Sequence, residues 1–184
     1  DVVVEGSAVN ATAVAIGRRV ILQPGVSCGR CEACLSGKDN ECASYEVLGY
    51  LHHDGGYAEY VKVPVQNLLS IPDEIDFVHA AAFPLTFLTA WHMLMTCARL
   101  KRWEDVLVLA ASSGVGMAAV QIAKLFHCRV IATAGGEQKM AKAKELGADY
   151  VIDHYKQDIS AEVKRIPEQR GVDIVFEHVG AATW

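Results

Sequence analysis

The stretch Cys28-Gly-Arg-Cys31-Glu-Ala-Cys34, followed after seven residues by Cys42, is the most informative segment of this 184-residue sequence. Four of the six cysteines fall within these fifteen residues. A C-x-x-C pair turns two sulfurs toward one centre, and a loop through Gly37 brings the second pair to the opposite edge of a tetrahedron. Four thiolates suit zinc, and four protein ligands leave no position for a substrate. The spacing therefore predicts a structural zinc site.

Three other interpretations of the cysteines are less favoured. In a ferredoxin-type iron–sulfur run the fourth cysteine follows after three residues and precedes proline, whereas here the gap is seven and Ala43 follows. Disulfides need an oxidising compartment, of which the sequence gives no sign. A zinc ribbon that binds nucleic acid usually carries a basic surface. This chain has a net charge of −5, with Glu32, Asp39 and Glu41 inside the lobe itself.

Composition indicates a soluble globular protein, because 52% of the residues are hydrophobic and both signs of charge are present. The apolar run from Ala80 to Leu100 is interrupted by Pro84 and several polar residues, so we expect a buried helix and not a membrane span. No signal peptide is visible. These features predict a cytoplasmic protein with no nucleic-acid or membrane partner. The chain opens on Asp1 inside an expected strand, which predicts an internal part of a longer protein.

The first part of the chain shows β patterns. Short β-branched runs at residues 2–5 and 19–22 predict strands, and residues 57–63 alternate like a half-buried strand after a glycine turn. His52 and His53 suggest a second metal site. Neighbouring residues of a strand point to opposite faces, so a surface loop is the favoured interpretation. We place a β domain over residues 1–75.

Residues 76–184 change to a helical period and then alternate between strands and helices. Asp76 is expected to cap a helix that Pro84 breaks, and a longer helix runs through Leu88 to Ala98. The expected strands are 106–110, 129–133, 150–152 and 172–176, and the expected helices are 115–127, 137–146 and 158–166. This alternation predicts a doubly wound parallel sheet of the α/β class.

The turn between the first strand and helix of that sheet matches a phosphate-binding turn. It contains Ser112, Ser113, Gly114, Val115 and Gly116, although only Gly116 is in register with the G-x-G-x-x-G template. A buried strand before it and a helix after it are the context in which a dinucleotide fold binds pyrophosphate. The alternative is a tight turn in which serines only cap the helix.

The end of the second strand indicates which nucleotide is bound. NAD sites usually place an acid there, but this chain has Thr133 followed by alanine and glycines. Without a carboxylate to repel it, a 2′-phosphate can rest on the backbone of Gly135 and Gly136, within reach of Lys139. The sequence thus favours NADP(H) over NAD(H). A solvated helix lysine is an equally good interpretation of Lys139.

Several further motifs combine with these features. In chain order they are Arg19-Val20 with Pro24-Gly25, the four cysteines, Asp54-Gly-Gly-Tyr-Ala-Glu-Tyr60, Ala80-Ala-Ala-Phe-Pro-Leu-Thr-Phe-Leu-Thr-Ala-Trp91, Ser113-Gly-Val-Gly116 with Gln121-Ile-Ala-Lys124, Leu146-Gly-Ala-Asp149 and Phe176-Glu-His-Val-Gly180. The combination resembles the medium-chain dehydrogenase/reductase superfamily, also called zinc-containing alcohol dehydrogenases. The resemblance is greatest to quinone oxidoreductase-like members that keep a structural zinc lobe. It implies a partial GroES-like domain with the lobe at about 26–44 and an incomplete Rossmann domain.

The resemblance also assigns roles to residues. It implies that Cys28, Cys31, Cys34 and Cys42 hold structural zinc and that residues 113–116 bind pyrophosphate. Thr89 would lie near the nicotinamide, and His178 and Val179 would line the adenosine half. The family's third catalytic zinc ligand falls on Leu85, which cannot bind a metal. This departure favours the zinc-independent reductases.

We therefore expect an oxidoreductase that transfers hydride between NADP(H) and a small carbonyl, enone or quinone. No catalytic residue is assigned. One alternative is a zinc-dependent alcohol dehydrogenase whose catalytic ligands lie outside these residues; another is a non-catalytic nucleotide sensor. The full-length protein is expected to form a homodimer or homotetramer, and the 184-residue chain alone is expected to be inactive.

Overall fold

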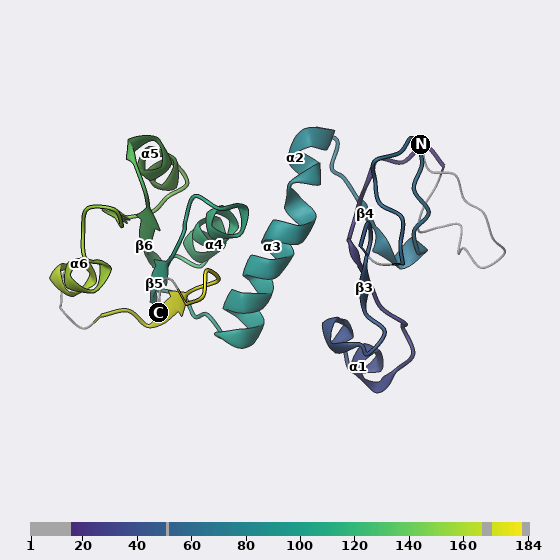
Figure 1. Cartoon of the computed structure of the whole chain (residues 1–184), viewed down its shortest axis with the longest axis horizontal. Coiled ribbons are helices and arrows are strands. Elements are labelled where there is room, and N and C mark those ends of the chain that lie inside the picture. The colour runs from purple at the N-terminus through teal and green to yellow at the C-terminus, as the bar shows by residue number, and fades with distance from the viewer. Residues whose placement is uncertain (1–15, 51, 167–170, 182–184) are drawn as a thin grey trace. The chain divides into compact units, whose positions relative to one another are not determined.

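The computed structural model describes residues 16–50, 52–166 and 171–181 (Figure 1). The chain packs as two compact units, unit 1 over Asp1–Leu85 and unit 2 over Thr86–Trp184. The strand expected at residues 2–5 lies outside the described residues.

Unit 1 contains two small antiparallel sheets. Strand β1 (Val20–Leu22) pairs with β4 (Leu68–Ser70), and β2 (Gly25–Val26) pairs with β3 (Glu46–Val47). The strand expected around residues 19–22 is therefore present. Its β-branched residues suit a pleated, half-buried surface, which explains why the sequence pattern was informative here.

A buried asparagine fixes the loops of unit 1. Asn67, at the end of the 3-10 turn η2 (Val65–Asn67), is only 4% exposed. Its side-chain amide donates to the carbonyls of Gln23 and Gly25 at 2.7 and 2.5 Å. A buried amide without hydrogen-bond partners would be destabilising, so the Asn67 side chain has to keep these bonds. They hold the segment before β4 against the segment that leads into β2.

The strand expected over residues 57–63 is not formed. Tyr57 and Tyr60 are exposed, and no strand within the described part of the chain pairs with this segment. Alternation makes a strand possible, but a neighbouring strand must satisfy its backbone groups. Here the pattern alone was misleading.

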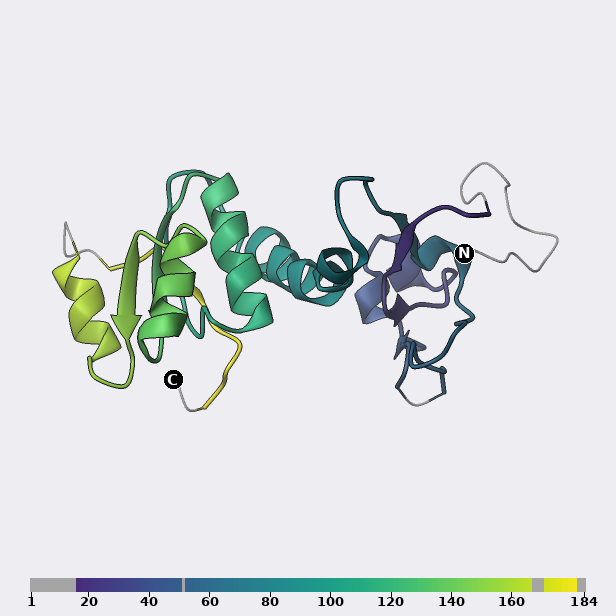
Figure 2. The ribbon, with the colours of Figure 1, turned by 90° about the horizontal axis from the view of Figure 1, so that it is seen from above.

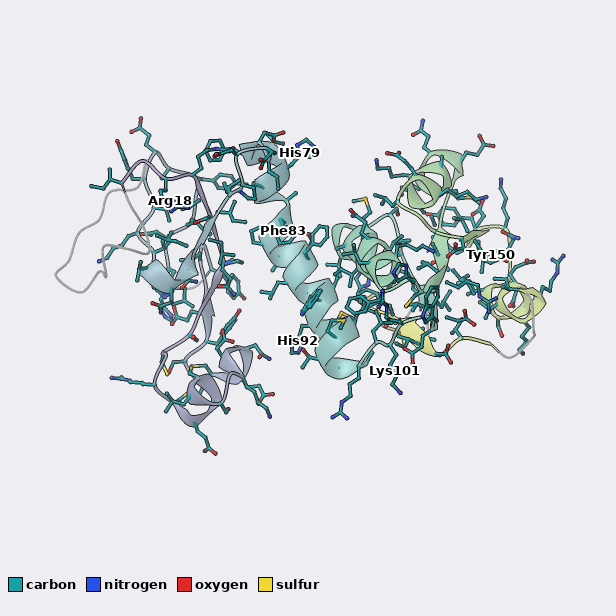
Figure 3. The ribbon with its side chains drawn as sticks, turned by 180° about the vertical axis from the view of Figure 1, so that it is seen from behind. Arg18, His79, Phe83, His92, Lys101 and Tyr150 are labelled. Carbon is teal, nitrogen blue, oxygen red and sulfur yellow. The ribbon has the colours of Figure 1, made fainter. Side chains whose placement is uncertain are left out.

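Two helices follow, separated by a break next to proline. The Asp76 carboxylate caps α2 (Phe77–Ala81) by accepting the His79 N–H at 2.9 Å, as expected. Helix α3 (Phe83–Trp91) starts one residue before Pro84 and continues as a π-helical turn, His92–Cys97. Phe83 and His92, which begin these two segments, are labelled in Figure 3. The boundary between the units falls within α3.

Unit 2 is built on a four-stranded parallel sheet in the order β7-β6-β5-β8. Its strands are β5 (Asp105–Val108), β6 (Arg129–Ala134), β7 (Tyr150–Asp153) and β8 (Ile174–Phe176). Its helices are α4 (Gly114–Leu125), α5 (Glu137–Glu145) and α6 (Ile159–Arg165). The α/β class with a parallel, doubly wound sheet is thus confirmed.

The two faces of the sheet are covered by different helices. Val106, Val120 and Ala143 belong to one buried cluster, so α4 and α5 cover the same face. Leu107 and Ile131 belong to a second cluster, against which residues of α6 pack. Figure 2 shows a strand of the sheet between α6 and α5. The winding direction therefore reverses between β5 and β8, and open α/β sheets bind ligands at the carboxyl ends of the strands where this happens.

Candidate metal centre and nucleotide site

The four clustered cysteines come from a small lobe of unit 1. Cys28 follows β2, and Cys31 is the N-terminal cap of α1 (Glu32–Leu35), which contains Cys34. Cys42 follows the 3-10 turn η1 (Asp39–Glu41). Figure 3 shows sulfur atoms gathered beside these short helices. One helical turn thus presents two sulfurs, while the segments on either side of it each supply one more.

The sulfur positions fit a zinc ion. All four Sγ atoms lie within 4.8 Å of one another, with Cys31–Cys34 at 3.4 Å and Cys28–Cys34 at 3.9 Å. Zinc bound to sulfur at about 2.3 Å requires the sulfurs to lie about 3.8 Å apart at the corners of a tetrahedron. Cys42 is buried, and the other three are half-buried. Among the described residues this is the only such group of potential metal ligands.

Backbone N–H groups favour the ionised state at one of these sulfurs. The pKa of Cys28 is lowered to about 6, chiefly by the backbone N–H of Arg30 and then by that of Cys31. The Cys28 N–H in turn donates to Cys42 Sγ at 3.5 Å. For Cys31 the Cys34 N–H lowers the pKa, but the Cys34 thiol and burial outweigh it and raise the pKa to about 11. Each of these two sulfurs thus has its own backbone donors, Arg30 and Cys31 for Cys28 and Cys34 for Cys31.

In unit 2, the turn after β5 begins α4 in the way a phosphate site requires. Ser113 caps the helix, and its Oγ accepts the Gly116 N–H at 2.9 Å. A Cβ on Gly116 would lie 2.3 Å from the Ala110 carbonyl oxygen, so only glycine allows helix and strand to approach this closely. Ala110 itself has a left-handed φ of 50°. The left-handed alanine therefore lies one residue before the first glycine position of the template, which Ala111 occupies.

The carboxyl end of β8 meets this turn. His178 Nε2 lies 3.0 Å from Ser113 Oγ, although 65 positions separate the two residues in the sequence. Glu177 Oε1 accepts the backbone N–H groups of Val179 and Gly180, which holds the loop that carries His178. The residues predicted for the pyrophosphate turn and the adenosine half therefore lie side by side at the reversal point between β5 and β8.

Two more of the predicted nucleotide residues are Thr133, near the end of β6, and Lys139, in the first turn of α5. Thr133 is 2% exposed, and its hydroxyl accepts the Ala110 N–H at 3.1 Å. Its side chain therefore hydrogen-bonds to the backbone of the turn after β5. Gly135, Gly136 and Lys139 belong to the group of residues that lines an open hollow at the start of α5. Lys139 is exposed there.

Sequence reasoning did not single out Tyr155, whose ring lies beside Gly135, one of the residues that line this hollow. Tyr155 follows β7, is 75% exposed, and its ring lies so close to Gly135 that a Cβ on the glycine would be 2.2 Å away. An aromatic residue two positions after a parallel strand is a signal that could have been used, because such residues lie at the carboxyl edge of the sheet, where open α/β sheets bind ligands.

The other residues singled out from the sequence lie elsewhere. Leu85 and Thr89 lie on α3, where Leu85 is 62% exposed and Thr89 is half-buried. His52 Nδ1 and His53 Nε2 contact different oxygens of Glu46, at 3.3 and 3.1 Å. Both histidines thus contact one partly buried carboxylate, an arrangement consistent with a surface loop.

Comparison with known proteins links both units to one family. The alcohol dehydrogenase GroES-like domain matches residues 2–73, and the zinc-binding dehydrogenase domain matches residues 114–184. Within the described residues, no helix has the length and apolar character that a membrane crossing requires.

Individual proteins give the same result. Sorbitol dehydrogenase of Bacillus subtilis is 34% identical over 90% of this chain and 46% of its own length. A quinone oxidoreductase of Pongo abelii is 35% identical over 67% of this chain and 37% of its own length. A crystal structure titled NAD-dependent alcohol dehydrogenase has a TM-score of 0.86 and 51% identity, covering 89% of this chain and 48% of that one. This chain therefore spans about half the length of such relatives, or less.

Proposed function

Since this chain belongs to the medium-chain dehydrogenase/reductase superfamily, we propose that the protein containing it is an oxidoreductase that uses a nicotinamide nucleotide. The observation that carries the proposal is the meeting of Ser113, Gly116 and His178 where the sheet reverses its winding. When bound, the nucleotide supplies or accepts a hydride at its nicotinamide ring. The N-terminus of α4 would bind its pyrophosphate, and Thr89 would lie against the nicotinamide half.

We propose that NADP(H) is preferred. Asp153 of β7 pairs in register with Ala134 at the end of β6. It is only 6% exposed and already accepts the Tyr155 N–H at 3.0 Å, so it is poorly placed to bind a ribose hydroxyl. Lys139 offers a cation at the hollow where a 2′-phosphate would lie. The competing preference for NAD(H) is supported by the relative named NAD-dependent alcohol dehydrogenase.

A charge substitution in α5 tests the preference. Lys139→Ala should weaken NADPH binding and leave NADH binding unchanged, because only the 2′-phosphate carries the extra charge. Lys142→Ala is the matched control, since Lys142 lies on the same helix and pairs with Glu145 at 2.8 Å. Fluorescence titration measures the affinities of the unmodified full-length protein and of both variants for NADPH and NADH. Tighter binding of NADH than NADPH by the unmodified protein would refute the preference.

For the reaction, we propose reduction of a small carbonyl, enone or quinone. Leu85 occupies the position of a catalytic zinc ligand in the family, and leucine cannot polarise an alcohol through a metal. An activated double bond or quinone is already electrophilic and needs only a donor for the developing oxyanion. The second candidate is zinc-dependent alcohol oxidation, which the sorbitol dehydrogenase relative favours. A third candidate, which is not an enzyme, is a sensor that binds the nucleotide without catalysing a reaction.

One set of assays separates these functions. NADPH loss with an enone or quinone is compared with NADP reduction by an alcohol, before and after treatment with a strong chelator. Reductase activity that survives chelation supports the proposal. Alcohol oxidation that chelation abolishes without unfolding would establish the second candidate. Nucleotide binding without turnover on any of these substrates would favour the sensor.

We also propose that Cys28, Cys31, Cys34 and Cys42 hold one zinc ion with a structural role. The sulfur spacing and the backbone N–H groups around Cys28 support it. Elemental analysis should find one zinc per chain. Iron with acid-labile sulfide, or a folded protein without metal, would contradict the assignment.

A further inference from the structure

The contact between Ser113 and His178 has a consequence for how the phosphate turn is oriented. Ser113 Oγ accepts the Gly116 N–H at 2.9 Å, which occupies one of its two lone pairs. His178 Nε2 lies 3.0 Å from the same oxygen. The hydroxyl has one proton, so the tautomer of His178 decides where that proton can point.

The two tautomers give opposite arrangements. If Nε2 is bare, it accepts the Ser113 hydroxyl proton, and the serine offers no donor to a ligand. If Nε2 carries hydrogen, it donates to the second lone pair of Ser113. Both lone pairs are then used, and the hydroxyl proton must point away from His178 and Gly116.

We propose that His178 is a positioning residue which, as the Nε2–H tautomer, directs the Ser113 hydroxyl proton onto a phosphate oxygen of the nucleotide. The inference rests on the proposed function, because it needs a nucleotide diphosphate at the N-terminus of α4. A bound anion selects this tautomer, since a hydroxyl that donates to an ionised oxygen makes a stronger bond than one that donates to neutral imidazole. His178 thereby acts on the phosphate through Ser113.

The rest of the site holds the imidazole for this task. The ring of Phe176, which is 2% exposed, meets the His178 ring edge-on at 5.7 Å between centroids. Glu177 accepts two backbone N–H groups of the same loop. An anchored ring and an anchored loop give Nε2 a fixed direction, as a positioning group needs.

The test uses the full-length protein and NADPH. His178→Gln keeps a side-chain N–H donor at similar reach, while His178→Leu removes it. The leucine variant should bind NADPH roughly tenfold more weakly and the glutamine variant within about twofold of the unmodified protein. In a Ser113→Ala background the leucine change should have no further effect, because the hydroxyl that it orients is gone. Equal affinities for the glutamine and leucine variants would overturn the inference.

A second measurement reads the tautomer of His178 in the unmodified protein. Nitrogen NMR of histidine-labelled protein distinguishes the two imidazole tautomers, and the signal missing from His178→Gln identifies His178. With NADPH bound, the Nε2–H tautomer is expected, and an Nδ1–H tautomer would overturn the proposal. If the unmodified protein bound neither NADPH nor NADH, the proposed function itself would fail, which is a separate outcome.

Discussion

Replacing Gly116 with alanine should damage both the stability of unit 2 and its nucleotide affinity. The new Cβ would lie 2.3 Å from the Ala110 carbonyl oxygen and 2.8 Å from Ala111 Cα. Real Cβ atoms stay beyond 3.0 Å, so α4 and the turn after β5 must separate by at least 0.7 Å. Overpacking of this kind costs about 1–3 kcal/mol, partly offset by about 1 kcal/mol of helix propensity gained over glycine. The same shift moves the cap at Ser113 and should weaken NADPH binding by roughly tenfold or more.

Two other glycines provide graded controls for this variant. At Gly56 the added Cβ meets nothing within 4 Å, so Gly56→Ala should be neutral. At Gly114 it meets the Thr86 Cγ2 at 2.8 Å, a side chain that can give way more easily than backbone. Thermal unfolding and NADPH titration should therefore rank Gly56→Ala, Gly114→Ala and Gly116→Ala from mildest to most severe. If Gly116→Ala melted and bound like the unmodified protein, the close approach of helix and strand would not matter.

Three further predictions concern other parts of the chain. Cys34→Ser should lose bound zinc in elemental analysis and destabilise unit 1, because metal binding at such sites is coupled to folding; retained zinc would contradict it. Arg129→Met removes the bidentate partner of buried Asp105 and should lower the free energy of unfolding in denaturant by about 3–5 kcal/mol. Arg165→Met breaks an exposed pair and should lower it by less than about 1 kcal/mol; equal losses for the two variants would refute the prediction. The backbone N–H of His79 is the main group that lowers the pKa of the Asp76 carboxyl. The stabilising contribution of the Asp76 cap should be complete above the ordinary carboxyl pKa of about 3.9 and be lost as the pH falls through the lower pKa of the folded state. A carboxyl NMR titration that gave Asp76 an ordinary or raised pKa would contradict this prediction.

Local patterns predicted most of unit 2 and the clustering of the four cysteine sulfurs. The cysteine spacing is a short-range signal, because one short turn joins the two pairs. The period change after residue 76 likewise placed each strand of the parallel sheet within a few residues of its observed bounds. Gly116 was the one template glycine in register, and it has the closest backbone contact of the turn.

The features that sequence reasoning missed depend on neighbours far away in the chain. Residues 57–63 alternate correctly, but whether they form a strand depends on a partner that the pattern does not specify. Tyr155 meets Gly135 only because β7 lies beside β6. The left-handed φ of Ala110 is set by the tight turn into α4, and alanine gives no sign of it in the sequence. Each of these depends on packing that a local pattern does not contain.

The order of strands in unit 2 also fixes when the nucleotide site can form during synthesis. Ser113 leaves the ribosome long before His178, because β6 and β7 lie between them in the sequence. The two residues meet only after β8 has paired with β5. A contact between residues so far apart in the sequence costs loop-closure entropy before its own interactions form, so this pairing is expected late in folding. A nascent chain that ends before β8 would carry a formed phosphate turn without its histidine. Nucleotide binding is then expected to stabilise the chains in which β8 has already paired with β5.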